Sequence, residues 1–109
     1  MNKVVLIGRL TSDVETKEFG KGKDKGTYAN FSLAVRRDEE NTDFIDCTAF
    51  GKTAEFIEEY LSKGNRIAIE GSLQKSSYED KEGEIHYQTK VIVQRQNLQM
   101  EQQKKKKDN

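Results

Sequence analysis

The stretch TDFIDCTAFGKTAEFIEEYLSKGNRIAIEGSL, residues 42–73, decides the fold of this chain. Apolar residues recur at every second position, then at every third or fourth, and then again at every second. This pattern predicts a strand over 44–50, a helix near 53–62 and a second strand over 66–73. The helix is short and acidic, and it lies between two strands. Such an arrangement is typical of a plug in a small barrel rather than of a helical protein.

The first of these strands has two different faces. Ile45, Cys47 and Ala49 are small and apolar, and they share the side that is suited to a core. Phe44 and Phe50 alternate with them on the opposite side. Because the inward side is already filled, we expect both phenylalanine rings to be exposed.

The helix carries one buried stripe, since Ala54, Ile57 and Leu61 follow the i, i+3, i+7 spacing of a single helical face. Lys63 and Gly64 then favour the end of the helix, because a cation suits the negative end of the dipole and glycine tolerates left-handed dihedrals. Alternation in the other segments adds further inward residues. These expected core residues are Ala29, Phe31, Leu33, Val35, Ile67, Ile69 and Leu73, together with Phe56 of the helix.

Alternation and turn residues divide the rest of the chain into short strands. Gly8 indicates a bend or a close backbone approach, and Gly71 a kink at a barrel corner. The remaining strands are predicted over 3–10, 15–19 and 28–36, and over two hairpin arms, 74–78 and 85–94, with a tip at 79–84.

Together these elements predict a mainly β protein of one domain. The order fits the OB-fold, a five-stranded Greek-key barrel, with one short helix between strands 3 and 4. We expect this domain to cover residues 1–98. Residues 99–109 are polar and basic, and we expect them to form a disordered tail.

Composition limits the class of protein. The 109 residues are 33% apolar and 35% charged, with a net charge of zero. A nucleic-acid binder with this balance must gather its basic residues on one face. No apolar run approaches the roughly 18 residues of a membrane span. Cys47 is the only cysteine, so no internal disulfide can form and a cytoplasmic location is expected.

Catalysis finds little support in the sequence. His86 is the only histidine, and with one cysteine it cannot supply four protein ligands to zinc. Gly51-Lys52-Thr53 ends like a phosphate-binding loop, but that loop needs glycine where Asp46 stands. We therefore expect no enzymatic activity, no metal and no cofactor, and we expect His86 to be an ordinary surface or sheet residue.

Aromatic and basic residues carry a stronger signal. Phe44, Phe50 and Tyr78 fall on strands or hairpin arms among polar neighbours. Proteins bind single-stranded nucleic acids with this combination, since rings stack on bases and cations follow the backbone. The alternative is that each ring belongs to the core. The cations that lie close to these rings in sequence are Lys52, Lys75, Arg36 and Arg37.

Over about residues 1–93 the chain resembles the bacterial and phage single-stranded DNA-binding proteins. The resemblance rests on NKVVLIGRL at 2–10, YANFSLAV at 28–35, DFIDCTAFGKTAEFIEEYLSKG at 43–64 and IEGSLQ at 69–74, with the hairpin around Tyr78.

This resemblance implies an OB-fold, usually a homotetramer, that wraps single-stranded DNA without sequence preference in replication, recombination and repair. It also implies that Phe44, Phe50 and Tyr78 stack on bases and that Lys52, Lys3 and Arg9 contact the DNA backbone. We expect a cytoplasmic protein associated with the nucleoid, or one in the host cytoplasm if it is phage-encoded.

The chain departs from this family in several ways. It has no tryptophan, which the family often uses as a stacking residue, and Asp46 places a negative charge on the expected binding face. Its last residues, KKKKDN, differ from the family's acidic tip, so we expect no recruitment of replication proteins through them. The competing interpretation is a replication accessory OB-fold that acts mainly as a protein-interaction module and binds nucleic acid weakly.

Overall fold

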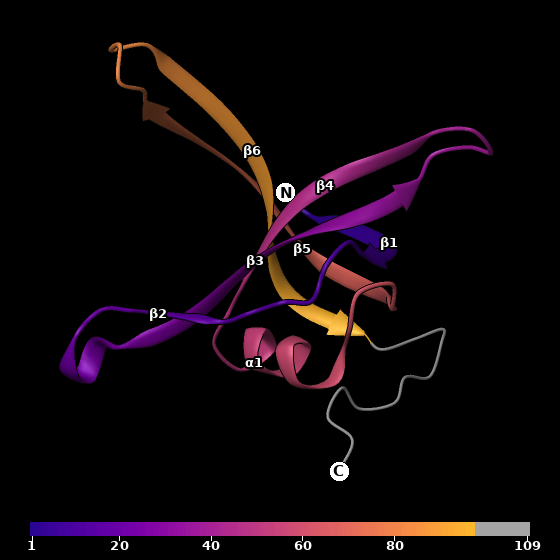
Figure 1. Ribbon diagram of the computed structural model, residues 1–109, viewed down its shortest axis with the longest axis horizontal. Coiled ribbons are helices and arrows are strands. Elements are labelled where there is room, and N and C mark those ends of the chain that lie inside the picture. Colours follow the sequence, from indigo (N-terminus) through magenta and orange to yellow (C-terminus); the bar gives the residue numbers. More distant parts are fainter. Residues whose placement is uncertain (98–109) are drawn as a thin grey trace.

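Five long strands form a closed barrel in the computed structural model of the protein, which describes residues 1–97 (Figure 1). The short helix α1 interrupts the strands between β4 and β5, which are the third and fourth of the five long strands. In chain order the elements are β1 (Val4–Leu10), β2 (Lys17–Phe19), the 3₁₀ turn η1 (Gly22–Asp24), β3 (Gly26–Arg36), β4 (Thr42–Phe50), α1 (Gly51–Tyr60), β5 (Arg66–Glu79) and β6 (Ile85–Asn97).

The strand pairings close the sheet on itself. The order runs β1-β5-β6-β4-β3, and β1 pairs again with β3 to complete the ring. All contacts are antiparallel except β4 with β6, where Cys47 lies opposite Val91 and Thr48 opposite Ile92. The three-residue β2 pairs only with β3, outside this ring. The predicted barrel is therefore confirmed, with β2 as a small addition.

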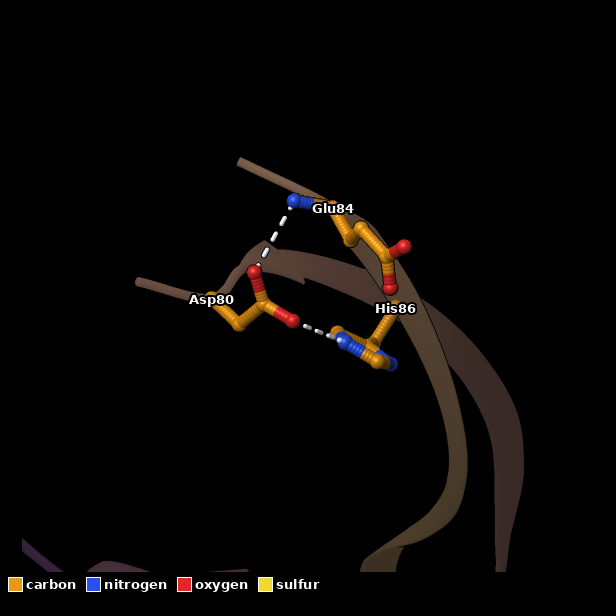
Figure 2. A group of neighbouring side chains, drawn as sticks. All are labelled: Asp80, Glu84 and His86. Atoms are coloured by element: carbon orange, nitrogen blue, oxygen red, sulfur yellow. Dashed lines mark hydrogen bonds and ion pairs between the residues drawn. The ribbon is translucent and has the colours of Figure 1, made fainter. Parts of the chain in front are cut away.

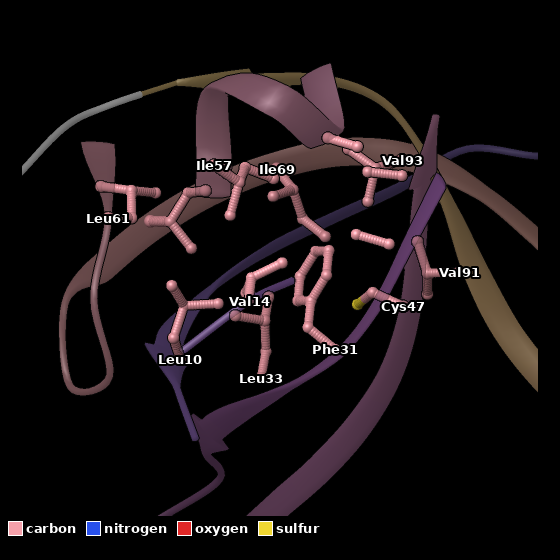
Figure 3. Close-up of a cluster of buried hydrophobic side chains, with 14 residues drawn as sticks. Leu10, Val14, Phe31, Leu33, Cys47, Ile57, Leu61, Ile69, Val91 and Val93 are labelled. Carbon is pink, nitrogen blue, oxygen red and sulfur yellow. The ribbon is translucent and has the colours of Figure 1, made fainter. Parts of the chain in front are cut away.

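The helix α1 packs against the barrel core along its predicted stripe. Ala54, Ile57 and Leu61 are fully buried and lie in one cluster with the inward residues of the strands (Figure 3). Burying a side chain the size of Ile57 stabilises the fold by about 1.5–3 kcal/mol. No helix among residues 1–97 is long and apolar enough to cross a membrane.

Two glycines let strands approach more closely than a side chain would allow. A Cβ at Gly8 would lie 2.7 Å from the carbonyl oxygen of Ala34 in β3. A Cβ at Gly71 would collide with the carbonyl oxygen of Ile92, beside the register shift that bends β5 against β6. Both glycines therefore mark close backbone contacts. The sequence predicted a bend or a close approach at Gly8 and a kink at Gly71, where the register shift lies.

Three details of the sequence interpretation were wrong. Leu73 is exposed, because β1 pairs with β5 only as far as Gly71 and β5 continues beyond it with β6 as an arm (Figure 1). Phe56 is only partly buried and packs on Tyr60 with ring centroids 4.7 Å apart. The helix begins two residues earlier than expected, at Gly51. The tail predicted over 99–109 lies outside the described residues.

Candidate nucleic-acid interface

The outer face of the β3–β4 pair presents an aromatic ring at each end. In the antiparallel register Phe44 lies opposite Ala34, and Phe50 lies opposite Tyr28. The exposed fractions are 67% for Phe44 and 46% for Phe50. Six residues of strand separate the two rings by about 20 Å. The alternation argument is therefore confirmed for both rings, which lie outside the core.

Between these rings the strand surface is polar. The hydroxyl of Ser32 donates a hydrogen bond to Oδ1 of Asp46 at 3.1 Å, so this carboxylate has a partner within the sheet. Thr48 donates to Oδ1 of Asn30 at 2.6 Å. Thr48 is nevertheless buried, because β6 pairs with β4 at this position.

This polar surface lies in a groove of about 440 Å³. Residues from four parts of the chain line it, so the groove exists only in the folded barrel. They are Thr11 and Ser12 after β1, Asn30, Phe31 and Ser32 of β3, Asp46, Cys47 and Thr48 of β4, and Gln88 and Lys90 of β6.

The arm formed by β5 and β6 extends the groove wall. Tyr78 is 56% exposed and lies opposite His86 in the register. Because side chains alternate along a strand, Tyr78 and His86 share a face with Gln88 and Lys90. Lys75 falls on the other face, where its Nζ lies 5.0 Å from the ring centroid of Tyr87. The structure therefore brings Tyr78, but not Lys75, to the groove side of the arm.

The tip of this arm is held by Asp80 (Figure 2). Its Oδ1 accepts the backbone N–H groups of Glu82 and Glu84, each at 2.9 Å. Its Oδ2 lies 2.7 Å from Nε2 of His86. The bond with His86, followed by those backbone donors, lowers the pKa of the Asp80 carboxyl.

The same residues are the candidates for binding a cation. Donor atoms of Asp80, Glu84 and His86 all lie within 4.8 Å of one another. Both oxygens of Asp80 already have partners in the turn. The grouping is thus accounted for by the architecture of the turn.

Several predicted cations have partners within the protein. Lys3 pairs with Glu70 at 2.8 Å. Arg37 makes a two-pronged contact with Asp43, through Nη2 at 2.8 Å and Nε at 3.1 Å. This contact raises the pKa of Arg37 and lowers the pKa of Asp43. Lys52, by contrast, is exposed in the first turn of α1, two residues after Phe50.

The other two predicted cations meet at a second depression. Arg9 and Arg36 line a hollow of about 390 Å³, and Arg66 joins them. Arg9 also donates from Nη1 to the carbonyl oxygen of Gly64 at 2.8 Å. Arg66 was missed from the sequence, because only the register that sets it opposite Arg9 places it here.

Sequence reasoning also missed an aromatic cluster around Phe50. The ring of Phe19 meets Phe50 edge-on, with centroids 6.3 Å apart, and it lies 5.9 Å from the ring of Tyr28. Since Ala29 and Phe31 face inward, alternation places Tyr28 on the outer face, and this signal could have identified it. The position of Phe19 depends on the pairing of β2 with β3. The three residues of β2 are too few for alternation to predict this pairing.

Comparison with known proteins finds one family and several relatives that all carry the same description. The family model described as "Single-strand binding protein family" matches residues 1–101. A single-stranded DNA-binding protein of Clostridium perfringens is 47% identical over 95 residues, covering 85% of this chain and 62% of that protein. One from Fusobacterium nucleatum is 51% identical over 87 residues, covering 72% of this chain and 54% of that protein. One from Staphylococcus epidermidis is 38% identical over 99 residues, covering 85% of this chain and 72% of that protein. The chain thus spans less than two thirds of the length of the first two relatives.

Proposed function

The chain belongs to the single-strand binding protein family, and from that premise we propose that it binds single-stranded DNA without sequence preference in replication, recombination and repair. The family is not enzymatic, and the protein's task is to hold DNA rather than to change it. The observation that carries the proposal is the exposure of three rings, Phe44, Phe50 and Tyr78. Phe44 and Phe50 lie at the two ends of β4, whose middle lines the polar groove, and Tyr78 lies on the arm whose Gln88 and Lys90 line it.

Rings of this kind suit bases of any identity. Every base has a flat face, and each stacked base contributes about 1–3 kcal/mol. The groove floor between Phe44 and Phe50 offers the polar groups of Asn30, Ser32 and Asp46, which can meet base edges. Such a surface favours binding without sequence preference, because stacking dominates the contact.

The charge of Asp46 indicates how single-stranded DNA would be oriented in the groove. A carboxylate on the groove floor repels phosphates, so the bases turn inward and the backbone follows the rim. One cation, Lys90, lines the groove itself. Lys52 follows Phe50 by two residues and lines a separate hollow with Lys25, Glu18 and Glu55. The arginine-lined hollow of Arg9, Arg36 and Arg66 offers planar donors that suit phosphate oxygens.

A salt-titrated binding isotherm on oligodeoxythymidine tests this proposal. Phe44→Ala should weaken binding by about 5- to 150-fold, the loss of one stacked base, with an unchanged melting temperature. Phe56→Ala is the matched control, because it removes the same ring from the helix, away from the groove, and should leave affinity unchanged. Wild-type protein that fails to bind the oligomer at low salt would refute the proposal.

Self-association is the second part of the proposal. The outward side chains of β1, Val5 and Ile7, are exposed by 63% and 49%, and they give this strand an apolar outer face. We expect this face to join subunits in a homotetramer built as a dimer of dimers. The same face favours the alternative function, a protein-interaction barrel. That alternative predicts weak DNA binding that is unaffected by Phe44→Ala.

The remaining features of the proposal concern the protein in the cell. We expect a cytoplasmic protein that associates with the nucleoid through DNA, or that acts in the host cytoplasm if it is phage-encoded. The predicted cations Lys3, Arg37 and Lys75 would then serve as secondary backbone contacts, because each already has a neighbour within the protein.

A further inference from the structure

We propose that His86 is a positioning residue for the contact between Tyr78 and DNA. It stacks on one face of the Tyr78 ring, is anchored by Asp80, and holds the ring so that a base can stack on the opposite face. This inference rests on the proposed function, in which Tyr78 meets a base of single-stranded DNA.

The stack itself is the first observation. The rings of Tyr78 and His86 lie 5.2 Å apart between centroids, with only 21° between their planes. The two residues are directly opposite each other in the register of β5 and β6, where side chains are close enough to form a cross-strand pair. The imidazole therefore covers one side of a ring that is otherwise exposed.

The second observation is the anchor behind the imidazole. His86 Nε2 lies 2.7 Å from Oδ2 of Asp80. Oδ1 of Asp80 in turn accepts the backbone N–H of Glu84 (Figure 2) and that of Glu82. The backbone N–H of Asp80 also donates to the carbonyl oxygen of Glu84 at 2.9 Å. Contacts thus run without a break from the turn of the arm to the Tyr78 ring.

The third observation is the direction of the stack. Tyr78 and His86 lie on the face of the arm that also carries Gln88 and Lys90, and those two side chains line the groove. The free face of Tyr78 therefore continues the groove wall beyond the barrel. A base leaving the groove would meet a ring that is already held in place.

This arrangement has a clear physical benefit. An exposed tyrosine on a hairpin arm samples several rotamers, and binding that immobilises such a side chain costs conformational freedom. Stacking on His86 restricts the ring before DNA arrives, so less freedom remains to be lost. His86, which was expected to be an ordinary surface or sheet residue, thus has a function in restricting the Tyr78 ring.

The test compares two oligomers of equal length and charge, oligodeoxythymidine and its abasic analogue. His86→Ala should weaken binding of oligodeoxythymidine by about 2- to 12-fold, the range expected for one aromatic pair, and should leave binding of the abasic oligomer unchanged. His86→Phe, which keeps a ring on Tyr78 but loses the bond to Asp80, should restore part of the affinity. His86→Gln, which keeps a polar group near Asp80 but loses the ring, should behave like His86→Ala.

A double-mutant cycle isolates the coupling. In a Tyr78→Ala background, His86→Ala should have no further effect on oligodeoxythymidine binding. If His86 had a purely structural role, His86→Ala would also weaken binding of the abasic oligomer, because a disordered arm misplaces Lys90 as well. That result would overturn the inference.

Failure of the inference differs from failure of the proposed function. If Tyr78→Ala weakens binding but His86→Ala does not, positioning by His86 is refuted and DNA binding stands. If neither change matters while the wild type binds, the arm makes no base contact and the inference falls alone. If the wild type binds neither oligomer, the proposed function fails.

Discussion

Lys52 and Arg37 are both predicted DNA contacts, but their surroundings differ. Lys52 is exposed two residues after Phe50, whereas Arg37 is held by Asp43. Lys52→Ala should therefore reduce the slope of log affinity against log salt by about 0.7, the effect of one phosphate contact on a single strand. Arg37→Ala should change this slope less, because Asp43 already balances its charge. Salt titrations with oligodeoxythymidine measure both slopes, and equal reductions would contradict the expectation.

Cys47 should be chemically inert in the folded protein. Burial in the barrel, followed by the nearby charge of Asp46, raises the pKa of its thiol to about 12, well above the ordinary value of about 8.5. A thiol reagent at pH 8 should label the protein only after denaturant is added. Rapid labelling of native protein would show that the core opens at this position.

The same shift predicts a loss of stability at high pH. The folded state favours the neutral thiol, so its contribution is complete below about pH 8.5 and is lost as pH rises toward 12. Urea unfolding at pH 7.5 and pH 10 should show this fall in wild type. In Cys47→Ala the fall should be smaller, because no thiol remains to ionise.

Residue-scale prediction from the sequence succeeded where alternation is strong. Phe44 and Phe50 were placed on the outer face because Ile45, Cys47 and Ala49 fill the inner one, and their exposure agrees. His86 could not be interpreted in this way. Its stack on Tyr78 depends on the register of two strands, and a single sequence does not display register.

Among the elements, β5 depends on one glycine. A Cβ at Gly71 would collide with the backbone of Ile92 in β6, and neither backbone can move without loss of strand pairing. Gly71→Ala should therefore destabilise the protein by about 1–3 kcal/mol, as for other overpacked sites. Thermal melting checks this, with Ser72→Ala as the neighbouring control, which should melt close to wild type. An unchanged melting temperature for Gly71→Ala would show that the bend is not required.

Element boundaries show what periodicity can and cannot provide. The helix was predicted because Ala54, Ile57 and Leu61 repeat at helical spacing, and all three are buried. The strand ending at Glu79 was predicted as two pieces, with Leu73 facing the core. Alternation continues unchanged where a strand leaves a barrel, so the pattern cannot mark that point.

For the whole molecule, the exposed apolar face of β1 makes the most direct prediction. Ile7→Asp should place a charge in any subunit contact made there, and the assembly should dissociate. Light scattering at micromolar concentration should then return the 12.5 kDa of one chain, against a multiple of it for wild type. A wild-type mass of one chain would contradict the proposed tetramer.

The site at this scale was only partly predictable. The exposure of Phe44 and Phe50 was predicted, but the groove joins β3 and β4 to Gln88 and Lys90, some forty residues away along the chain. Sequence reasoning grouped Lys75 with the rings because it is near Tyr78 in sequence. The arm instead turns it to the opposite face, over Tyr87.

The parallel contact between β4 and β6 has a consequence for how the protein is made. The pairing of Cys47 with Val91 can form only after β6 has been synthesised, and the pairing of Val4 with Gly71 only after β5 has been synthesised. Hairpins can form early, but contacts between distant segments delay closure and slow folding. During synthesis the ribosome must therefore release nearly the entire barrel sequence before the core can seal. Until then the apolar first strand remains open to chaperones and to neighbouring nascent chains.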